Sequence, residues 1–433
     1  MKQRQITAAA AAVVIAGLAA CGSSSTTSSS SSGSSAAPKN VTLNVWLMSG
    51  SAPAALVTAW NQQFEQAHPG VTVNVSLQQW TGIVTKTDTA LATSSPPDVL
   101  EMGNTYVAGF ASTGGLQDLS GLTFENKGSW LQSLTEAGTY DGKLYGVPYY
   151  AGDRIAIYNT AMFAKAGISS PPTTTSELLS DLAAIKASEP SGVSGIYIPG
   201  EYWYTMFSWL FGMGGSIATN SNGTWSAQFS SSADQTALSW IEDNLFKTGY
   251  DLAPADQNDT TTTTNAIFEK GQAAIVVEPG WDYGSIQSDL KGNAMLSDLS
   301  AFALPGTSAS APLPVFLGGS NLGVSSKSPN KTLAEQYVQL VEGTQFESEM
   351  ATVGGVIPNS TTLLGLNAEN PVLNTANQAA TTSWFTPNTP QESTLESQNV
   401  YENLLGAIFS GQQSVSAAAA TADSTANGIL NGS

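Results

Sequence analysis

Residues 41–78, VTLNVWLMSGSAPAALVTAWNQQFEQAHPGVTVNVSLQ, decide the fold. Apolar residues alternate over 41–48 and again over 71–78, which is the period of a β-strand with one buried face. Between these runs an apolar residue recurs at every fourth position from Leu56 to Phe64, and this spacing predicts the buried face of a helix. A strand, a helix and a second strand in this order predict a parallel sheet covered by helices, and therefore an α/β fold.

The same two patterns continue along the chain. Short apolar runs bounded by Pro, Gly or Asn are typical of buried strands, and segments with helical spacing separate them. We expect further strands at 96–103, 154–159 and 273–277, and helices at 80–94, 105–113, 233–247 and 331–350. A chain of 433 residues is too long for one hydrophobic core, so we expect two domains.

The first twenty residues have the order of a secretory signal. Lys2 and Arg4 precede an apolar stretch too short to span a bilayer, and small residues lead to Cys21, the single cysteine of the sequence. This order resembles a bacterial lipobox. It implies a signal peptide at 1–20 and a lipid on Cys21 that anchors the protein to the extracytoplasmic face of a bacterial membrane. A plain signal peptide with an accidental cysteine is the alternative. Residues 21–38 are rich in serine and predict a flexible tether.

The composition excludes several classes of function. A net charge of −19 would repel nucleic acid and anionic lipid headgroups. Once Cys21 is acylated, no thiol is left for a disulfide, a metal or nucleophilic catalysis. His68 is the sole histidine, so we expect no Ser-His-Asp triad, no metal site and no cofactor. Only 11% of the residues are charged, and a polar surface made of Ser, Thr, Asn and Gln suits neutral, hydroxyl-rich partners.

Six stretches, in this order, carry a resemblance to a known family. They are similar to segments of the extracytoplasmic solute-binding proteins of ABC importers, in particular the sugar-binding family that includes maltose-binding protein. The stretches are VWLMSG (45–50), FEQAHPGVTVNV (64–75), PPDVLEMGNTYVAGFASTGGLQDLS (96–120), DGKLYGVPYYAGDRIAIYN (141–159), FEKGQAAIVVEPGW (268–281) and FLGGSNLGVSSKSPNKTLAEQYVQLV (316–341).

The resemblance implies a two-lobe periplasmic-binding-protein-like fold, with discontinuous lobes joined by a hinge and the ligand in the cleft between them. By the same resemblance the chain passes between lobes near 151–154, near 280–284 and near residue 335. The predicted lobes are 39–151 plus 284–334 and 152–283 plus 335–433.

The resemblance also implies the function. We expect the substrate-binding component of an ABC transporter, a monomer that captures a monosaccharide or oligosaccharide outside the cytoplasmic membrane and delivers it to the permease. Within the family the chain looks most like receptors for chito-oligosaccharides and other β-linked disaccharides. We expect no enzyme. One alternative is a secreted glycoside hydrolase, which needs two facing carboxylates such as Asp153 with Glu201 or Glu278. Another is a receptor for a polyamine, a peptide or a metal.

A sugar site needs aromatic surface for C–H faces and hydrogen-bond partners for hydroxyls. The loops after the predicted strands offer both. In VEPGWDYG (277–284) the position of Trp281 matches a sugar-stacking tryptophan of the family, whereas Tyr283 stays open between ligand contact and packing. The predicted ligand-binding residues are Ser49, Trp80, Asn104, Tyr150, Asp153, Arg154, Tyr202, Trp203, Trp281, Asn321 and Trp384.

Several of these residues have a plain structural alternative. The side chain of Trp203 can pack in a core instead of facing a ligand, and for Trp80 and Trp384 both interpretations stay open. Asn104 can form an Asx turn, and Asn321 can belong to a β-turn. Beside Asp153, this sequence has Gly152 where maltose-binding proteins show an acidic residue, so the acidic contact implied by the family is open at this point.

Overall fold

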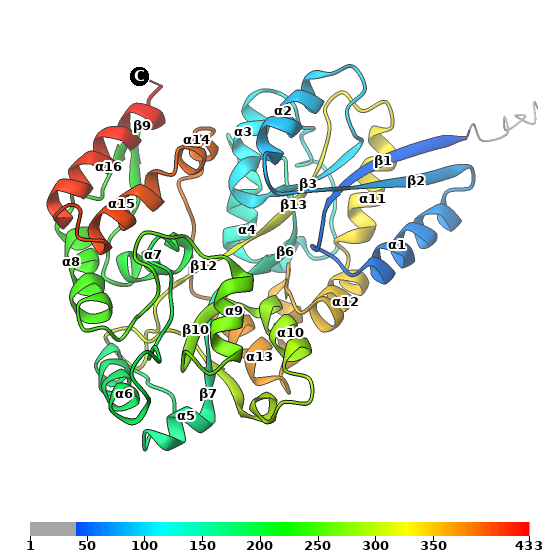
Figure 1. The fold of residues 1–433 in the computed structure, drawn as a ribbon. Coiled ribbons are helices and arrows are strands. Elements are labelled where there is room, and N and C mark those ends of the chain that lie inside the picture. The colour runs from blue at the N-terminus through cyan, green and yellow to red at the C-terminus, as the bar shows by residue number, and fades with distance from the viewer. Residues whose placement is uncertain (1–39, 433) are drawn as a thin grey trace, which may run out of the picture. The chain divides into compact units, whose positions relative to one another are not determined.

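The computed structural model describes residues 40–432 and contains two main sheets in separate halves of the molecule (Figure 1). The first sheet has six strands in the order β14-β6-β13-β3-β1-β2, and the second has three in the order β10-β7-β11. The predicted signal peptide, Cys21 and the Ser-rich tether lie outside the described residues.

The strands of the six-stranded sheet are β1 (Val41–Met48), β2 (Val71–Gln78), β3 (Val99–Gly103), β6 (Val147–Gly152), β13 (Gly318–Val324) and β14 (Ile357–Pro358). The helices of this half are α1 (Ala54–Ala67), α2 (Ile83–Ala92), α3 (Val107–Ser112), α4 (Gln132–Ala137), α11 (Lys331–Val341) and α12 (Thr344–Gly354), with short turns η1 (Asn104–Tyr106) and η2 (Lys127–Ser129).

The opening stretch folds as its pattern predicts. β1 pairs with β2 in parallel over its whole length, and β1 also pairs in parallel with β3. On α1, Leu56, Trp60 and Phe64 are all buried, and they pack with Leu43 and Val45 of β1 in one core. β13 runs antiparallel between β3 and β6, so the sheet as a whole is mixed.

The second half surrounds β7 (Arg154–Asn159), β10 (Ile275–Pro279) and β11 (Leu299–Phe302), which pair antiparallel. Its helices are α5 (Thr160–Lys165), α6 (Thr175–Ser188), α7 (Trp203–Gly212), α8 (Ser232–Ile241), α9 (Thr261–Glu269), α10 (Gly280–Asp289), α13 (Pro371–Ala379), α14 (Glu392–Ser397), α15 (Val400–Phe409) and α16 (Val415–Leu430). Shorter elements are β4 (Thr139–Tyr140), β5 (Lys143–Leu144), β8 (Ala218–Ser221), β9 (Thr224–Ala227), β12 (Val315–Phe316), β15 (Ser383–Trp384), η3 (Glu242–Phe246), η4 (Ala294–Asp298) and η5 (Thr361–Asn367).

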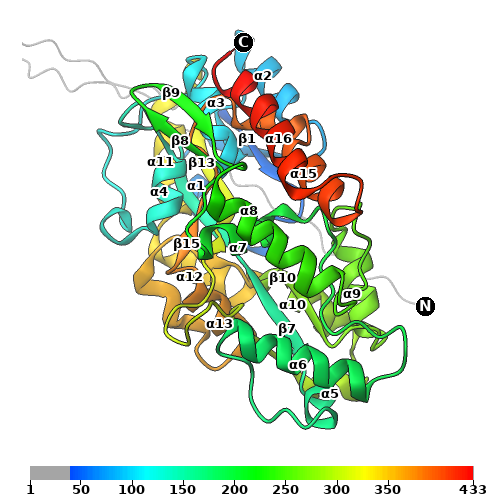
Figure 2. The same cartoon turned by 90° about the vertical axis from the view of Figure 1, so that its left-hand side faces the viewer.

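The three-stranded sheet is covered on both faces. Along β7, Ala156 packs in a cluster with α6, whereas Ile155 and Ile157 pack with α10 and α13 on the opposite face. This alternation is the side-chain period of a strand. Figure 2 views this half with α5 and α6 beside β7.

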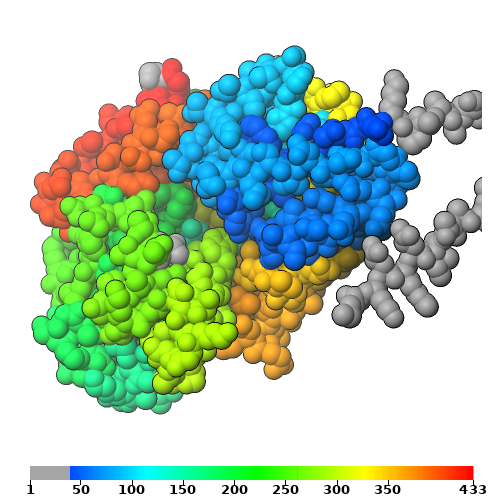
Figure 3. Space-filling model, turned by 45° about the vertical axis from the view of Figure 1, so that its right-hand side comes forward, coloured from blue at the N-terminus to red at the C-terminus, as the bar shows by residue number. Residues whose placement is uncertain are grey.

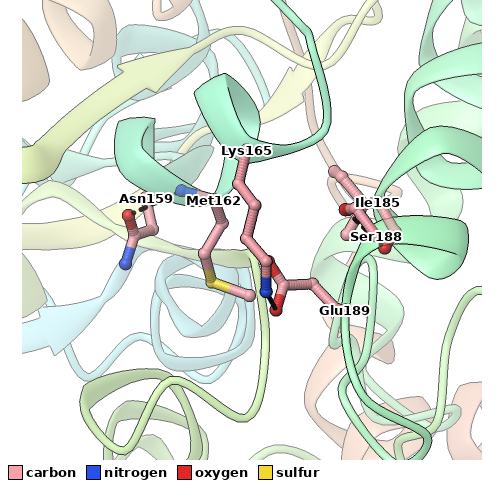
Figure 4. Close-up of polar contacts among 6 residues, drawn as sticks. All are labelled: Asn159, Met162, Lys165, Ile185, Ser188 and Glu189. Atoms are coloured by element: carbon pink, nitrogen blue, oxygen red, sulfur yellow. Dashed lines mark hydrogen bonds and ion pairs between the residues drawn. The ribbon is translucent and has the colours of Figure 1, made fainter.

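The end of β7 shows how one residue changes the chain from strand to helix (Figure 4). The Asn159 side chain accepts hydrogen bonds from the backbone N–H groups of Ala161 (2.9 Å) and Met162 (3.2 Å), and so caps α5. Lys165, at the last turn of α5, forms an ion pair of 2.7 Å with Glu189, which follows α6. The cap and the ion pair hold α5 against α6 at the edge of the sheet.

The chain passes from the six-stranded sheet to the three-stranded sheet at Asp153, the one residue between β6 and β7. This passage lies where the resemblance implied it. The return passage lies between β11 and β13, and the chain leaves the six-stranded sheet again after β14.

The other two implied passages, near 280–284 and near 335, stay predictions. Residues 280–284 begin α10, which shares a core with β7 and β10, and α11 and α12 contact α1. The exact lobe boundaries stay a prediction, and the strand pairing favours boundaries that follow the two sheets. The helix expected over 331–350 is two helices, because α12 starts anew after Gly343.

None of the helices formed by residues 40–432 combines the length and the apolar character that crossing a membrane requires.

Candidate functional site

Two adjoining cavities lie where the two halves of the molecule meet. Their volumes are about 470 Å³ and about 310 Å³, and both are bordered by Trp80, Tyr150 and Trp281. Each of these aromatic residues comes from a different element: the loop after β2, the strand β6 and the first turn of α10. We call the two cavities together the cleft, and Figure 3 shows the recessed surface between the blue and green regions.

Trp281 occupies its position because the residue behind it has no side chain. A Cβ atom on Gly152 would lie 1.8 Å from Cζ3 of the Trp281 ring, far inside van der Waals contact. The ring therefore lies directly on the backbone of β6. Its neighbour on that strand, Tyr150, meets it edge to face, with ring centroids 6.4 Å apart and an interplanar angle of 84°.

The larger cavity is bordered by hydroxyl groups on one side and by aliphatic groups on the other. Ser49 and Ser51 lie in the loop between β1 and α1, where Gly50 takes a positive φ of 87° that allows the sharp turn. Val353 and Val356 close the cavity from the end of α12. This mixture of hydroxyl donors and apolar surface suits a ligand that has both polar and C–H faces.

The smaller cavity contains the charged residues of the cleft, Arg154 and Glu396. It is bordered by Asn104, Tyr106, Arg154, Tyr204, Phe316 and Glu396. The Arg154 guanidinium lies 4.3 Å from the centre of the Tyr204 ring, and its Nε donates a hydrogen bond of 3.0 Å to the Tyr202 hydroxyl. Held in this way on one edge, Arg154 keeps its remaining N–H groups for other acceptors.

Asn104 joins the two halves at this cavity. Its side-chain Nδ2 donates a hydrogen bond of 2.9 Å to the carbonyl oxygen of Leu317, in the segment that returns to the six-stranded sheet. Next to the turn η1, burial raises the pKa of Glu396 to about 7, and hydrogen bonding from the side chains of Thr105 and Tyr106 opposes this shift. A carboxyl group that is partly protonated near neutral pH can both donate and accept hydrogen bonds.

Six of the eleven predicted residues line the cleft: Ser49, Trp80, Asn104, Tyr150, Arg154 and Trp281. The other five lie behind its walls. Trp203 is 2% exposed, with its ring centroid 4.9 Å from that of Tyr401 and 5.4 Å from that of Phe316. Trp384 stacks on Phe211 at 4.5 Å. Both tryptophans therefore follow the packing alternative, because they lie on the inner faces of α7 and β15.

The remaining three lie behind the cleft walls, and each is a polar or ionisable side chain. Tyr202 supports Arg154 from behind through its hydroxyl group. Asn321 is fully buried in β13 and donates a hydrogen bond of 3.1 Å to the carbonyl oxygen of Gly146. Asp153 is fully buried at the passage between the sheets, and burial raises its pKa well above the usual range. Tyr283, which the sequence left open, packs in the core beside α13.

Sequence reasoning missed several residues that border the cleft. Tyr204 follows Trp203 in the same aromatic run, and of these two residues only Tyr204 borders the cavity. Tyr106 and Phe316 lie within stretches that carry the family resemblance, and that proximity is the one signal that could have found them. Glu396 and Ser285 belong to helices whose pattern marks no site, so no local signal pointed to them.

Comparisons with known proteins agree with this architecture. A family model described as bacterial extracellular solute-binding protein matches residues 59–381. The diacetylchitobiose binding protein DasA of Streptomyces coelicolor is 34% identical over 378 residues, which is 87% of each chain.

Two solved structures share the fold. The GacH receptor of Streptomyces glaucescens aligns with a TM-score of 0.77 at 23% identity and covers 91% of this chain and 99% of its own. The sugar-binding protein MalE from Xanthomonas citri aligns with a TM-score of 0.79 at 21% identity, covering 90% and 98%.

Proposed function

This chain belongs to the family of bacterial extracellular solute-binding proteins, and we propose that it captures a sugar or short oligosaccharide for an ABC importer. The resemblance inferred from the six motifs is confirmed, and so is the two-lobe α/β fold that it implied. The family is extracellular, which agrees with the predicted location outside the cytoplasm.

The observation that carries the proposal is the aromatic wall of the cleft. Trp281, Tyr150 and Trp80 offer flat surface for the C–H faces of sugar rings. Hydroxyl, amide and guanidinium groups surround this wall, and they match the hydroxyl groups of a neutral saccharide. A pure polyamine site would instead need several ionised carboxylates facing the cleft.

The division of the cleft supports a ligand of more than one ring. The two cavities meet at the same three aromatic side chains, so a disaccharide would place one ring on either side of them. The relative DasA is named for diacetylchitobiose, and we propose an N-acetylated or other β-linked disaccharide as the first ligand to test.

The mechanism follows from where the contacts originate. Ser51 and Tyr150 come from the half with the six-stranded sheet, whereas Arg154 and Tyr204 come from the other half. A ligand that touches both halves stabilises the closed arrangement by the difference between its contacts in the closed and open states. We propose that a monomer, anchored by lipid on Cys21, presents this closed form to the permease.

We further propose that the cleft binds without catalysis. The glycoside hydrolase alternative would use Asp153 with Glu201 or Glu278, but Asp153 and Glu278 are 0% exposed and border neither cavity. Reducing ends are measured after incubation with chito- and cello-oligosaccharides. A steady release that depends on protein concentration contradicts this part of the proposal.

The binding proposal is tested by thermal unfolding and titration calorimetry with diacetylchitobiose, cellobiose, maltose and glucose, with spermidine and a mixed peptide pool as the non-sugar arms. A ligand at 100 times its Kd stabilises the protein by about 2.7 kcal/mol, which raises the unfolding temperature measurably. We expect a rise with at least one disaccharide. A rise with spermidine or peptide alone would assign the cleft to another class of solute.

A further inference from the structure

A buried carboxyl group lies behind the larger cavity. Glu101 is in the middle of β3, between Leu100 and Met102, and is 3% exposed. It borders neither cavity, so it does not itself face a ligand. Burying a carboxyl group is unfavourable unless its oxygens find hydrogen-bond partners, and an apolar side chain at this position would avoid the cost.

The two oxygens of Glu101 reach elements that do face the ligand. Oε2 accepts hydrogen bonds of 2.7 Å from the backbone N–H of Met48 and from the Ser51 hydroxyl. Oε1 accepts a longer bond of 3.4 Å from the Tyr150 hydroxyl, which in turn accepts one of 3.4 Å from Ser320. One side chain therefore joins three segments: the end of β1 with its loop, β6 and β13.

Ligand binding at the two cavity walls that Glu101 supports is sensitive to small displacements of those walls. The loop at 48–51 contains Gly50 in a left-handed conformation and carries Ser49 and Ser51, two of the serines that border the larger cavity. Tyr150 presents its ring edge to Trp281. A shift of about 1 Å in such groups is enough to weaken binding strongly, because hydrogen bonds to the ligand lose their geometry.

We propose that Glu101 is a positioning residue, which sets the loop at 48–51 and Tyr150 in the arrangement that binds the ligand. The inference rests on the proposed function for its effect on affinity, but the arrangement of the loop can be measured without ligand.

The protonation state of Glu101 decides which hydrogen bonds the Ser51 hydroxyl can form. The single Ser51 hydroxyl hydrogen is offered two acceptors, the Met48 carbonyl oxygen at 2.8 Å and Glu101 Oε2 at 2.7 Å. It can serve only one of them, and a proton on Glu101 allows both contacts to be hydrogen bonds. Burial raises the pKa of Glu101 to about 7, against hydrogen bonds from Met48, Ser51, Ser320 and Tyr150 that lower it.

Glu101 is the one group in this cluster that titrates near neutral pH, as its neighbours show. From β6 these are Tyr149 and Tyr150, whose pKa values burial raises well above 10, and the partners from the β1 loop and β13 are uncharged. Below pH 7 the neutral carboxyl group keeps every contact. Above pH 7 the charged carboxylate takes the Ser51 hydrogen from the Met48 carbonyl oxygen and strengthens the bonds that it accepts from the Met48 N–H and from Tyr150, so the loop and the affinity change as pH rises from 6 to 8.

The experiment uses Glu101→Leu and Glu101→Gln, with Glu347→Gln as the matched control. Glu347 is a fully buried carboxyl group of the same half, which accepts a hydrogen bond of 2.8 Å from the Asn359 backbone and borders neither cavity. Diacetylchitobiose is the probe for calorimetry at pH 6, 7 and 8. Hydrogen exchange of the peptide containing residues 48–51 is followed in ligand-free protein.

We expect Glu101→Leu to weaken binding about tenfold, the effect of one lost hydrogen bond to a charged or ionisable group, and to speed exchange at 48–51. Glu101→Gln restores part of the affinity and removes its pH dependence, whereas Glu347→Gln changes neither affinity nor exchange. Wild-type affinity and exchange in Glu101→Leu would overturn the inference while leaving the proposed function in place. If wild-type protein binds no saccharide, the proposed function fails, and exchange alone decides the role of Glu101.

Discussion

Trp281 and Trp203 each stand in the first turn of a helix, and their surroundings are opposite. Trp281 begins α10, lies on the bare backbone at Gly152 and borders both cavities. Trp203 begins α7 and is enclosed by Phe316, Trp384 and Tyr401. The same residue type in the first turn of a helix therefore borders the cleft in one place and belongs to the core in the other. The two rings differ in which distant segment of the chain packs against them.

The largest expected effect separates the two tryptophans by stability. Trp203→Ala removes a fully packed ring, and we expect the free energy of unfolding to fall by roughly 3–5 kcal/mol. Affinity for the ligand, measured in the fraction that remains folded, stays close to wild type. Chemical denaturation and calorimetry on the same preparation check both values. A loss of affinity with unchanged stability would return Trp203 to the binding site.

Trp281→Ala is expected to do the reverse. Its partly buried ring borders both cavities, and under the proposed function we expect binding to weaken by about 2–4 kcal/mol, roughly 30- to 1,000-fold, as for a central aromatic contact. The unfolding transition moves much less than in Trp203→Ala. Trp225→Ala, on β9 and outside both cavities, serves as the control. Equal affinity in the two variants would argue against the platform.

Gly152→Ala tests the contact that distinguishes the two rings. A methyl group at this position overlaps the Trp281 ring, so the ring must move, at a cost of about 1–3 kcal/mol in stability, in affinity or in both. Gly121→Ala is the control, because no heavy atom lies within 4 Å of its added Cβ. Tryptophan fluorescence reports the displacement. An unchanged spectrum with unchanged affinity would mean that the ring is not held by this contact.

The smallest effect concerns Glu396, which borders the smaller cavity. Burial raises its pKa from 4.5 to about 7, so its contribution to stability is complete below pH 4.5 and is lost as pH rises through 7. Glu396→Gln removes this dependence. Because the side chain also borders the open cleft, we expect a difference of only about 1 kcal/mol between pH 5 and pH 8. Denaturation curves at the two pH values measure it, and parallel behaviour of both proteins would refute the assignment.

How far the sequence predicts the molecule depends on the range of the interactions concerned. The strand, helix and strand of residues 41–78 are set by local periodicity, and the structure has them at the predicted positions. The surroundings of Trp203 and Trp384 are made by β12, β15 and α15, which meet only after folding. Asn321 likewise found a backbone partner at Gly146, far away in sequence. Composition cannot distinguish a polar side chain that has a hydrogen-bond partner within the protein from one that binds a ligand.

The passages between the two halves show the same limit. The family resemblance implied a passage near 151–154, and in the structure two strands follow one another there with only Asp153 between them. The later passages run through irregular segments, where neither periodicity nor turn residues mark a change of sheet. A Pro-Gly pair at 279–280 suggested a turn between lobes, yet it starts α10 within the same half.

The close contact between Gly152 and Trp281 has a consequence for comparing receptors of this family. The ring occupies the volume that would belong to a side chain on β6, so two distant positions share one place in space. In a receptor that keeps this backbone geometry, a side chain at the first position would meet the ring at the second. The two positions are therefore best compared as a pair and not one by one.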